Sequence, residues 1–208
     1  MRKIILTLMV LSAGLSAIAQ NTYGLDDGNA RANKRQKSMS AWQKDMDEFK
    51  ARSAHERQLH ALADSLASVQ GRAALVNQDF VLEATSVTFK NGTTTFVNST
   101  TNFISLKGNK AVVQISPSNF ASGPNGVGGV TVEGNVSDLM VRTDSKGRTT
   151  LSMNVMGIGI NAQVEVYMYP NTNRASATVY PNFNSNTIWL QGTIVPYENS
   201  NVFEGNSL

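Results

Sequence analysis

The sequence contains no cysteine, and only two of its 208 residues are histidine. Without cysteine the chain forms no disulfide, no thiolate metal site and no thiol nucleophile. His55 and His60 lie five residues apart in a charged segment, and that interval places two helical side chains on different faces. We therefore predict no metal site, no cofactor and no Ser–His or Cys–His catalytic system.

No apolar run reaches the roughly twenty residues that a membrane-spanning helix requires. The longest run, residues 4–18, is uncharged, follows Arg2 and Lys3, and leads into Ala-Ile-Ala at 17–19. This combination is typical of a secretory signal peptide. We expect a signal peptide over residues 1–19, cleavage before Gln20, and a soluble periplasmic or secreted product without an integral membrane segment.

The chain also lacks a strong excess of charge of one sign. Two of its 18 Lys and Arg residues lie in the predicted signal peptide, which leaves 16 against 15 Asp and Glu residues. Nucleic acids attract proteins through a strong positive field, which a near-neutral chain does not have. We therefore expect no nucleic-acid partner.

Residues 31–74 contain no proline and one glycine, and are rich in Lys, Arg, Gln, Ala and acidic residues. Apolar side chains recur there at intervals of three and four residues, which is the spacing of one helical face. The segment predicts a charged amphipathic helix over 31–74, preceded by a flexible leader at 20–30. We call the two apolar rows the first stripe (Met39, Trp42, Met46 and Phe49) and the second stripe (Leu59, Leu62, Leu66, Val69, Ala73 and Val76).

The stripes are ten residues apart, one fewer than a continuous heptad pattern requires. We therefore expect a hinge or a phase shift within residues 50–58. One interpretation is a coiled-coil seam; the other, which we adopt as the expectation, is that the second stripe packs onto the following domain. The first stripe is then a candidate surface for an envelope protein partner.

From residue 75 onward, Val, Ile, Thr, Phe and Tyr alternate with polar residues, and Gly or Asn recurs at short intervals. Alternation is typical of β-strands, and Asn and Gly favour tight hairpin turns. Connections this short leave no room for crossover helices, so the strands are antiparallel. We predict a mainly β domain at 75–208, an antiparallel meander of about ten strands that forms either a barrel or a two-sheet sandwich. The predicted strands include GVTVEGNV, DLMVRTD, TTLSMNVMG and RASATVYP.

Residues 123–129 contain four glycines and a proline. A phosphate-binding glycine loop requires a helix after it, because the helix N-terminus supplies the amide groups that hold the phosphate. The segment that follows here has the pattern of a strand. We therefore interpret the glycine-rich stretch as a long turn.

Four strand residues form a candidate ligand-binding surface: Glu165, Tyr167, Tyr169 and Trp189. In each predicted strand, alternation places them on the face opposite the apolar side chains. Aromatic rings with a polar edge suit sugars and other small amphipathic ligands. In the alternative interpretation, these aromatics are covered by the second stripe of the helix.

Carboxylates are the remaining candidates for catalysis. Glu83, Glu133 and Glu165 lie in the middle of predicted strands. A glycosidase-type hydrolase requires two carboxyl groups roughly 5 to 9.5 Å apart across a cleft. The hydrolase hypothesis therefore requires two of these three residues to converge.

The segments DFVLEATSVTFKNG, GPNGVGGVTVEGNVSD and MNVMGIGINAQVEVYMY follow one another in this order along the β region. From Gln78 to the C-terminus the chain resembles, on these segments, a family of exported Bacteroidetes proteins defined as a domain of unknown function, number 4251. The resemblance implies a periplasmic or secreted β protein and implies no catalytic residue. Our leading hypothesis is a non-enzymatic envelope protein whose β domain binds a small or amphipathic ligand. An interaction or scaffold protein that assembles through its helix is the alternative, and the oligomeric state stays open.

Overall fold

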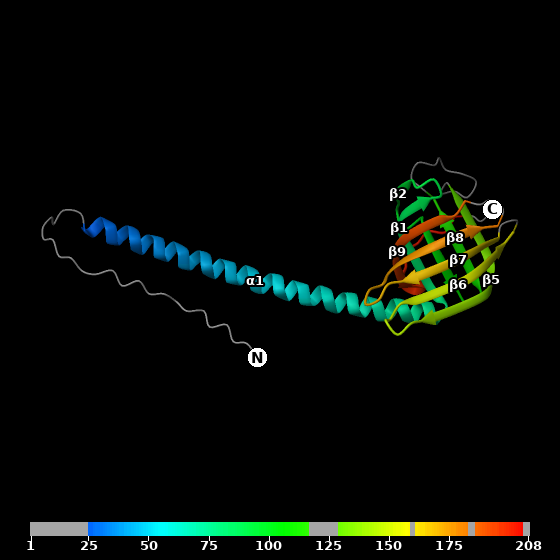
Figure 1. Cartoon of the computed structure of the whole chain (residues 1–208), viewed down its shortest axis with the longest axis horizontal. Coiled ribbons are helices and arrows are strands. Elements are labelled where there is room, and N and C mark those ends of the chain that lie inside the picture. The colour runs from blue at the N-terminus through cyan, green and yellow to red at the C-terminus, as the bar shows by residue number, and fades with distance from the viewer. Residues whose placement is uncertain (1–24, 117–128, 159–160, 183–185, 206–208) are drawn as a thin grey trace, which may run out of the picture. The chain divides into compact units, whose positions relative to one another are not determined.

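A long helix followed by nine strands makes up the computed structural model of the protein, which describes residues 25–116, 129–158, 161–182 and 186–205 (Figure 1). The predicted signal peptide and most of the glycine-rich stretch lie outside the described residues. The elements are α1 (Leu25–Val76), β1 (Asp79–Phe89), β2 (Thr94–Phe96), β3 (Phe103–Lys107), β4 (Lys110–Ile115), β5 (Val130–Thr143), β6 (Thr149–Gly157), β7 (Asn161–Met168), β8 (Arg174–Pro181), β9 (Ile188–Pro196) and the short 3-10 helix η1 (Tyr197–Asn199).

Helix α1 is longer than the predicted helix at both ends. It begins at Leu25, so residues 25–30, which we expected in a flexible leader, are helical. The helix is also continuous through residues 50–58, so of the two expectations the hinge is wrong and the ten-residue interval is a phase shift of the apolar rows within one helix. No proline interrupts residues 25–76, and Gly28, the one glycine in the added N-terminal part of the helix, lowers helix stability by only about 1 kcal/mol.

Contacts divide the chain into two units, one ending at His55 and one beginning at Glu56. In the first unit, Met39, Trp42 and Phe49 are each 64 % exposed, and Met46 is half-buried. In the second unit, the last part of α1 belongs with the strands.

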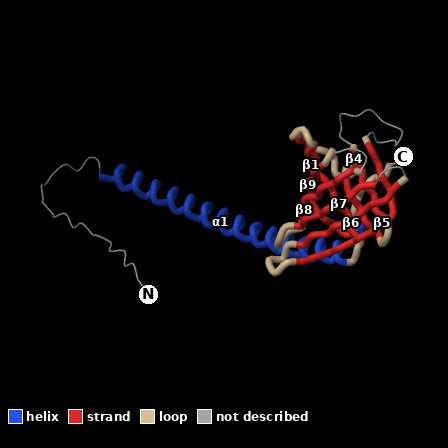
Figure 2. The backbone as a smooth tube through the Cα atoms, turned by 45° about the vertical axis from the view of Figure 1, so that its right-hand side comes forward, coloured by secondary structure: helices blue, strands red, loops and turns tan. Residues whose placement is uncertain are grey.

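The strands form one antiparallel sheet that closes on itself (Figure 2). Neighbouring strands follow the order β1-β3-β4-β5-β6-β7-β8-β9, and β9 pairs with β1 from Phe80 to Phe89. This pairing closes an eight-stranded barrel. The short strand β2 pairs with the C-terminal half of β1, from Ser86 to Thr88. Of the two predicted architectures, the barrel is therefore confirmed.

Nine strands form where about ten were predicted, because one long strand covers two predicted ones. The predicted break between GVTVEGNV and DLMVRTD lies inside β5, which is continuous over 14 residues. There the pairing with β6 shifts between Ser137 and Met140, and Asp138 has a positive φ of 52°. A β-bulge of this kind bends a strand without ending it.

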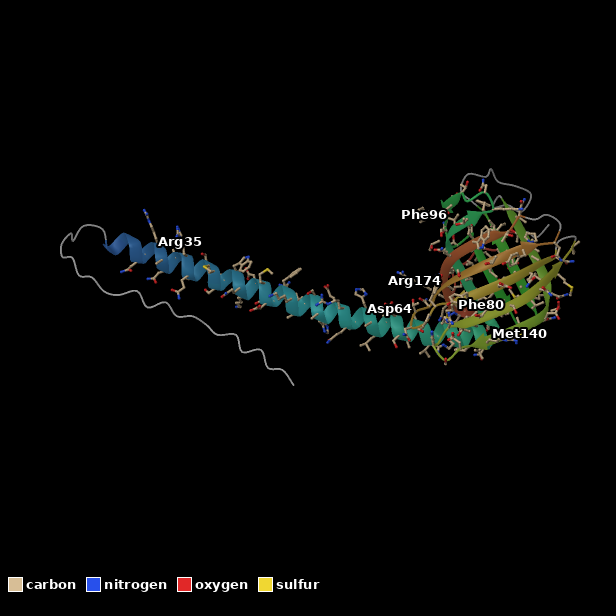
Figure 3. All side chains as sticks on the ribbon, in the orientation of Figure 1. Arg35, Asp64, Phe80, Phe96, Met140 and Arg174 are labelled. Carbon is tan, nitrogen blue, oxygen red and sulfur yellow. The ribbon has the colours of Figure 1, made fainter. Side chains whose placement is uncertain are left out.

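Alternate side chains of the strands fill the barrel interior, and Phe80 lies within the ring of strands in Figure 3. In β7, for example, Val164 and Val166 are buried while Gln163 and Glu165 are exposed. Leu75, from the last turn of α1, is 0 % exposed and belongs to the same core. The end of the helix thus contributes to the core of the barrel.

The C-terminal segment covers part of the barrel's outer face. Val81, Phe103 and Val112 form a second apolar cluster against Tyr197 and Val202. Next to it, the fully buried Gln114 donates to the carbonyl oxygens of Thr101 and Phe203, at 3.1 and 2.8 Å. Gln114 Oε1 accepts from Thr131 Oγ1 and from the backbone N–H of Gly205. This buried hydrogen-bond network holds residues 203–205 against β4.

Candidate functional site

The last four turns of α1 contact the barrel through small residues. Ser68 and Ala74 are almost fully buried, and Gly71 is buried between them. A Cβ atom added at Gly71 would lie 3.3 Å from both Asn173 Cβ and the carbonyl oxygen of Ile194. The helix backbone therefore lies directly against the β7–β8 turn and the end of β9.

The second stripe lies on a different face of the helix and is exposed. Leu59, Leu62, Leu66, Val69 and Val76 are between 53 and 68 % exposed, and Ala73 is exposed as well. The expectation that this stripe packs onto the β domain is therefore wrong. The same holds for the alternative in which the stripe covers the aromatic residues of the sheet.

The physical reason for this difference is the close approach of the helix to the barrel. At Gly71 there is no room for a side chain without displacing neighbouring atoms. Residues without large side chains allow such an approach, whereas a row of leucines would hold the helix away from the strand ends. The face with Ser68, Gly71 and Ala74 is therefore the one that is buried, with Leu75 at its end in the barrel core, and the face with the leucines of the second stripe is left in solvent.

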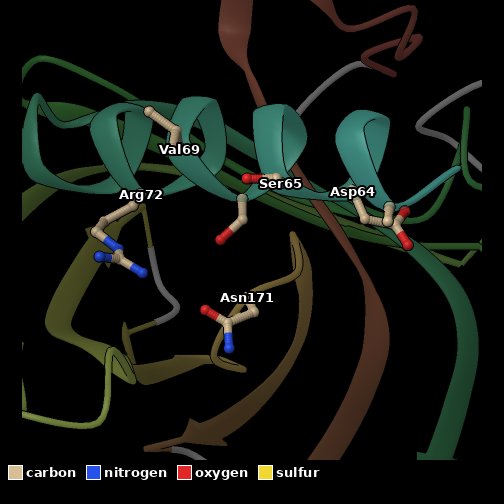
Figure 4. Close-up of a pocket in the computed structure, with 7 residues that line it drawn as sticks. Asp64, Ser65, Val69, Arg72 and Asn171 are labelled. Atoms are coloured by element: carbon tan, nitrogen blue, oxygen red, sulfur yellow. The ribbon is translucent and has the colours of Figure 1, made fainter. Parts of the chain in front are cut away.

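A groove of about 520 Å³ runs beside the contact between α1 and the β7–β8 turn (Figure 4). Arg72 extends from the helix on the side where Asn171 of that turn lies. Arg72 Nη2 donates to the carbonyl oxygen of Gly147 at 3.3 Å. Its Nε atom is buried and has no hydrogen-bond partner within the described part of the chain. The groove is lined by Ala61, Asp64, Ser65, Ser68, Val69, Arg72 and Asn171.

The groove joins one cationic and one anionic side chain with hydroxyl and amide groups. Arg72 can donate to a ligand oxygen, and Asp64, two helical turns earlier, accepts hydrogen bonds. Such a lining suits hydrogen bonding to a small polar molecule.

The β5–β6 turn that accepts the Arg72 hydrogen bond is itself held by Asp144. Asp144 Oδ1 accepts from the backbone N–H groups of Lys146 and Arg148, each at 2.9 Å, and Oδ2 accepts from the Arg148 guanidinium. The Arg148 side chain, followed by these backbone groups, lowers the pKa of Asp144 below its ordinary value. The turn that presents Gly147 to the helix is thus internally braced.

The four residues predicted as a ligand surface lie on the outer face of the barrel. Glu165, Tyr169 and Trp189 are exposed, and Tyr167 is half-buried with its ring 5.1 Å from that of Tyr169. Strand β8 lies between the tyrosines and Trp189. Two of its small residues are directly paired with the aromatics: Ser176 lies opposite Tyr167 of β7, and Thr178 lies opposite Trp189 of β9. The four residues share one outer face with a strip of hydroxyl groups between the aromatics, and none of them lines the groove beside α1.

The three glutamates of the hydrolase hypothesis do not converge. Glu83 in β1 accepts a hydrogen bond from Ser200 Oγ at 2.7 Å, and Glu133 in β5 pairs with Lys110 Nζ at 3.3 Å. Strands β3 and β4 separate these two residues, and β6 lies between Glu133 and Glu165. The required pair of carboxylates across one cleft is therefore not formed by these residues.

In the described part of the chain, no three His, Asp or Glu side chains come together as a metal-binding cluster. None of the helices that the structure describes is both long enough and apolar enough to cross a membrane.

An eight-stranded antiparallel barrel whose core includes the end of an N-terminal helix defines the class of this protein. The family model of the domain of unknown function DUF4251 matches residues 64–194. A crystal structure at 1.95 Å resolution of a DUF4251 family protein from Bacteroides eggerthii DSM 20697 is 44 % identical, with a TM-score of 0.61. The match covers 69 % of this chain and 96 % of that one. The chain therefore belongs to the DUF4251 family. No curated protein matches it.

The sequence patterns did not indicate the residues that hold the helix on the barrel. Ser68, Gly71 and Arg72 lie between the residues of the second stripe and have no periodic signal of their own. Gly71 was the available clue, because a glycine inside a helix costs stability and its presence indicates a packing requirement. Asn171, on the far side of the groove, is in a turn with φ of 56° and was recognisable only as a turn residue.

Proposed function

We propose that this protein is an exported, non-enzymatic cell-envelope protein that binds another protein through the second stripe of α1. The observation that carries the proposal is the exposure of all six stripe residues, at strict intervals of three and four. A contiguous apolar surface in water is the usual mark of a protein contact. Because the helix packs on its own barrel through another face, the stripe is free for a partner.

Two features of the barrel support a scaffold role. Its interior is a packed apolar core, and the three mid-strand glutamates lie on different strands without converging. The first stripe adds Met39, Trp42 and Phe49 as further exposed apolar side chains on the same helix. The predicted signal peptide supports export, and a mature N-terminus at Gln20 by sequencing of the host protein is the expected result.

Photo-cross-linking in the host envelope tests the proposal. A photoreactive residue at Leu62 is expected to give a discrete protein adduct, and the same residue at the exposed Gln163 of β7 is the control. The adduct at Leu62 is expected to disappear when Leu66→Glu is added, because a charge at the centre of the stripe opposes apolar contact. Equal adducts at Leu62 and Gln163, or none at Leu62, would overturn the proposal.

Ligand binding on the outer face of the barrel is a second candidate function. It is favoured by the arrangement of Tyr167 and Trp189 on either side of the small, hydroxyl-bearing β8 residues, since flat aromatic surfaces stack on sugars. We expect a native mass spectrum of protein from the host to contain added mass that is lost on denaturation. Tyr167→Ala with Trp189→Ala is expected to remove it, and Tyr180→Ala to retain it; a bare wild-type protein contradicts this candidate.

A further inference from the structure

The apolar stripe of α1 has a partner that the chain itself can supply. We infer that the second stripe binds the second stripe of another copy of this chain, parallel and in register, as a two-stranded coiled coil. This inference rests on the proposed function, because it identifies the protein that the stripe binds.

The second stripe has the spacing of a heptad seam. Leu59, Leu66 and Ala73 occupy one core position of the heptad, called a, and Leu62, Val69 and Val76 occupy the other, called d. All six side chains are exposed, and Val69 also lines the edge of the groove beside α1. In a coiled coil, side chains at these two positions pack between four residues of the facing helix.

Most of the helix residues that are buried against the barrel lie away from this seam. The buried residues Ser68, Gly71, Ala74 and Leu75 occupy heptad positions c, f, b and c. In a two-stranded coiled coil, positions b, c and f face away from the partner helix. Each copy can therefore keep its own barrel on the outer side while the two stripes meet.

Charges beside the seam favour an identical partner. Flanking positions e and g usually select partners by charge, and like charges there repel. Between residues 58 and 72 these positions hold Gln58, Ala63, Ser65, Gln70 and Arg72. Arg72 is the one charged member of this set, and it donates to Gly147 of its own barrel. Two copies therefore meet without repulsion along this seam, and nothing in it selects an oppositely charged partner.

The first stripe indicates the parallel direction. The ten-residue interval between Phe49 and Leu59 breaks the heptad, and a partner must have the same break at the same place. A parallel copy in register satisfies this condition at all ten stripe positions. An antiparallel copy satisfies it at only eight positions, because the intervals from Met39 to Val69 read the same from both ends but Ala73 and Val76 are then left without a partner. A parallel copy also places Asp45, at a g position, opposite Lys50 of its partner, at an e position.

Disulfide trapping tests the inference, and the absence of native cysteine makes each introduced thiol unique. In the full mature chain, Leu59→Cys and Leu62→Cys are expected to form disulfide-linked dimers on mild oxidation. Asp64→Cys, at the outward f position, is the control and is expected to react at least about tenfold more slowly, because a disulfide needs Cα atoms within about 7 Å. Equal rates at all three positions would overturn the inference.

Two additional results decide between the remaining outcomes. A mixture of Leu59→Cys and Val76→Cys that forms only mixed dimers would indicate antiparallel pairing and would overturn the parallel arrangement. In sedimentation, the wild-type chain is expected to have twice the monomer mass, and the Leu66→Glu chain the monomer mass. The urea unfolding curve of Leu66→Glu at high dilution is expected to match that of the wild type, which shows that the variant is folded. A wild-type monomer overturns self-pairing, whereas a Leu62 photo-adduct with a different protein would leave the proposed function intact.

Discussion

The barrel and the end of α1 use their apolar residues in opposite ways. In β7, the regularly spaced residues Val164 and Val166 are buried and their polar neighbours are exposed. In the helix, the regularly spaced Leu62 and Leu66 are exposed, and Ser68 and Gly71, which follow them on another face, are buried. A periodic pattern thus identifies residues that share a face, but it does not identify what that face contacts.

The difference arises because a closed sheet supplies its own partners. Every inward side chain of the barrel faces side chains from other strands, so alternation alone is enough to predict burial. A helix that packs on the end of a barrel has several faces available. The face that approaches most closely is selected by small side chains, and here Gly71 is against the backbone of β9 and the β7–β8 turn.

The largest expected effect on stability is the difference between two leucine-to-alanine substitutions, one on the buried face of the helix and one on the exposed face. Leu75→Ala is expected to lower the free energy of unfolding by about 2–5 kcal/mol, because Leu75 is fully buried in the core. Leu66→Ala, the same chemical change on the exposed stripe, is expected to change it by less than about 0.5 kcal/mol. Urea unfolding at high dilution measures both values, and equal losses would contradict the assignment of the two faces.

A smaller effect is expected from filling the space at Gly71. Gly71→Leu is expected to lower the free energy of unfolding by about 1–3 kcal/mol, because the new side chain meets Asn173 and Ile194. The control is Gln70→Leu, which adds the same side chain one residue earlier at an exposed position. Urea unfolding of both variants tests this contact, and a Gly71→Leu chain as stable as the control would show that the helix does not approach so closely.

The smallest effect is expected at the turn that faces Arg72. Because the folded state lowers the pKa of Asp144, its charge stabilises the fold above the unfolded pKa of about 3.9, and this contribution is lost as the pH falls through the folded-state pKa. Asp144→Asn is expected to lower the melting temperature slightly at pH 7. The difference from wild type is expected to shrink below about pH 4. A difference that does not change with pH would indicate that the carboxylate charge has no role in the turn.

Much of the barrel was predictable from alternation and turn residues. Strands β6 and β8 begin and end where the pattern predicted, because each is bounded by turn residues such as Gly147 and Asn173. The break predicted inside β5 was wrong, because the polar residues around Asp138 form a bulge and not a turn. Closure of the sheet was not predictable, because it depends on the pairing of β1 with β9, about a hundred residues apart.

The candidate site was less predictable than the fold. Both apolar stripes are visible in the sequence, since helical periodicity shows which residues lie together. That the second stripe is exposed depends on the choice of docking face, which Gly71 decides through a contact with residues distant in sequence. The groove beside α1 combines Arg72 with Asn171, and no local pattern links a helix to a turn about a hundred residues away.

The connection between helix and barrel has a mechanical consequence. Only Asn77 and Gln78 separate the end of α1 from β1, and both make backbone hydrogen bonds to the last turns of the helix. A pull on the helix therefore reaches β1 without the slack of a flexible linker. Strand β1 is bonded along both edges, to β3 and β9, so tension enters the barrel at the strand that closes it. In this protein the helix that would transmit a pull and the strand that closes the barrel are adjacent parts of one chain.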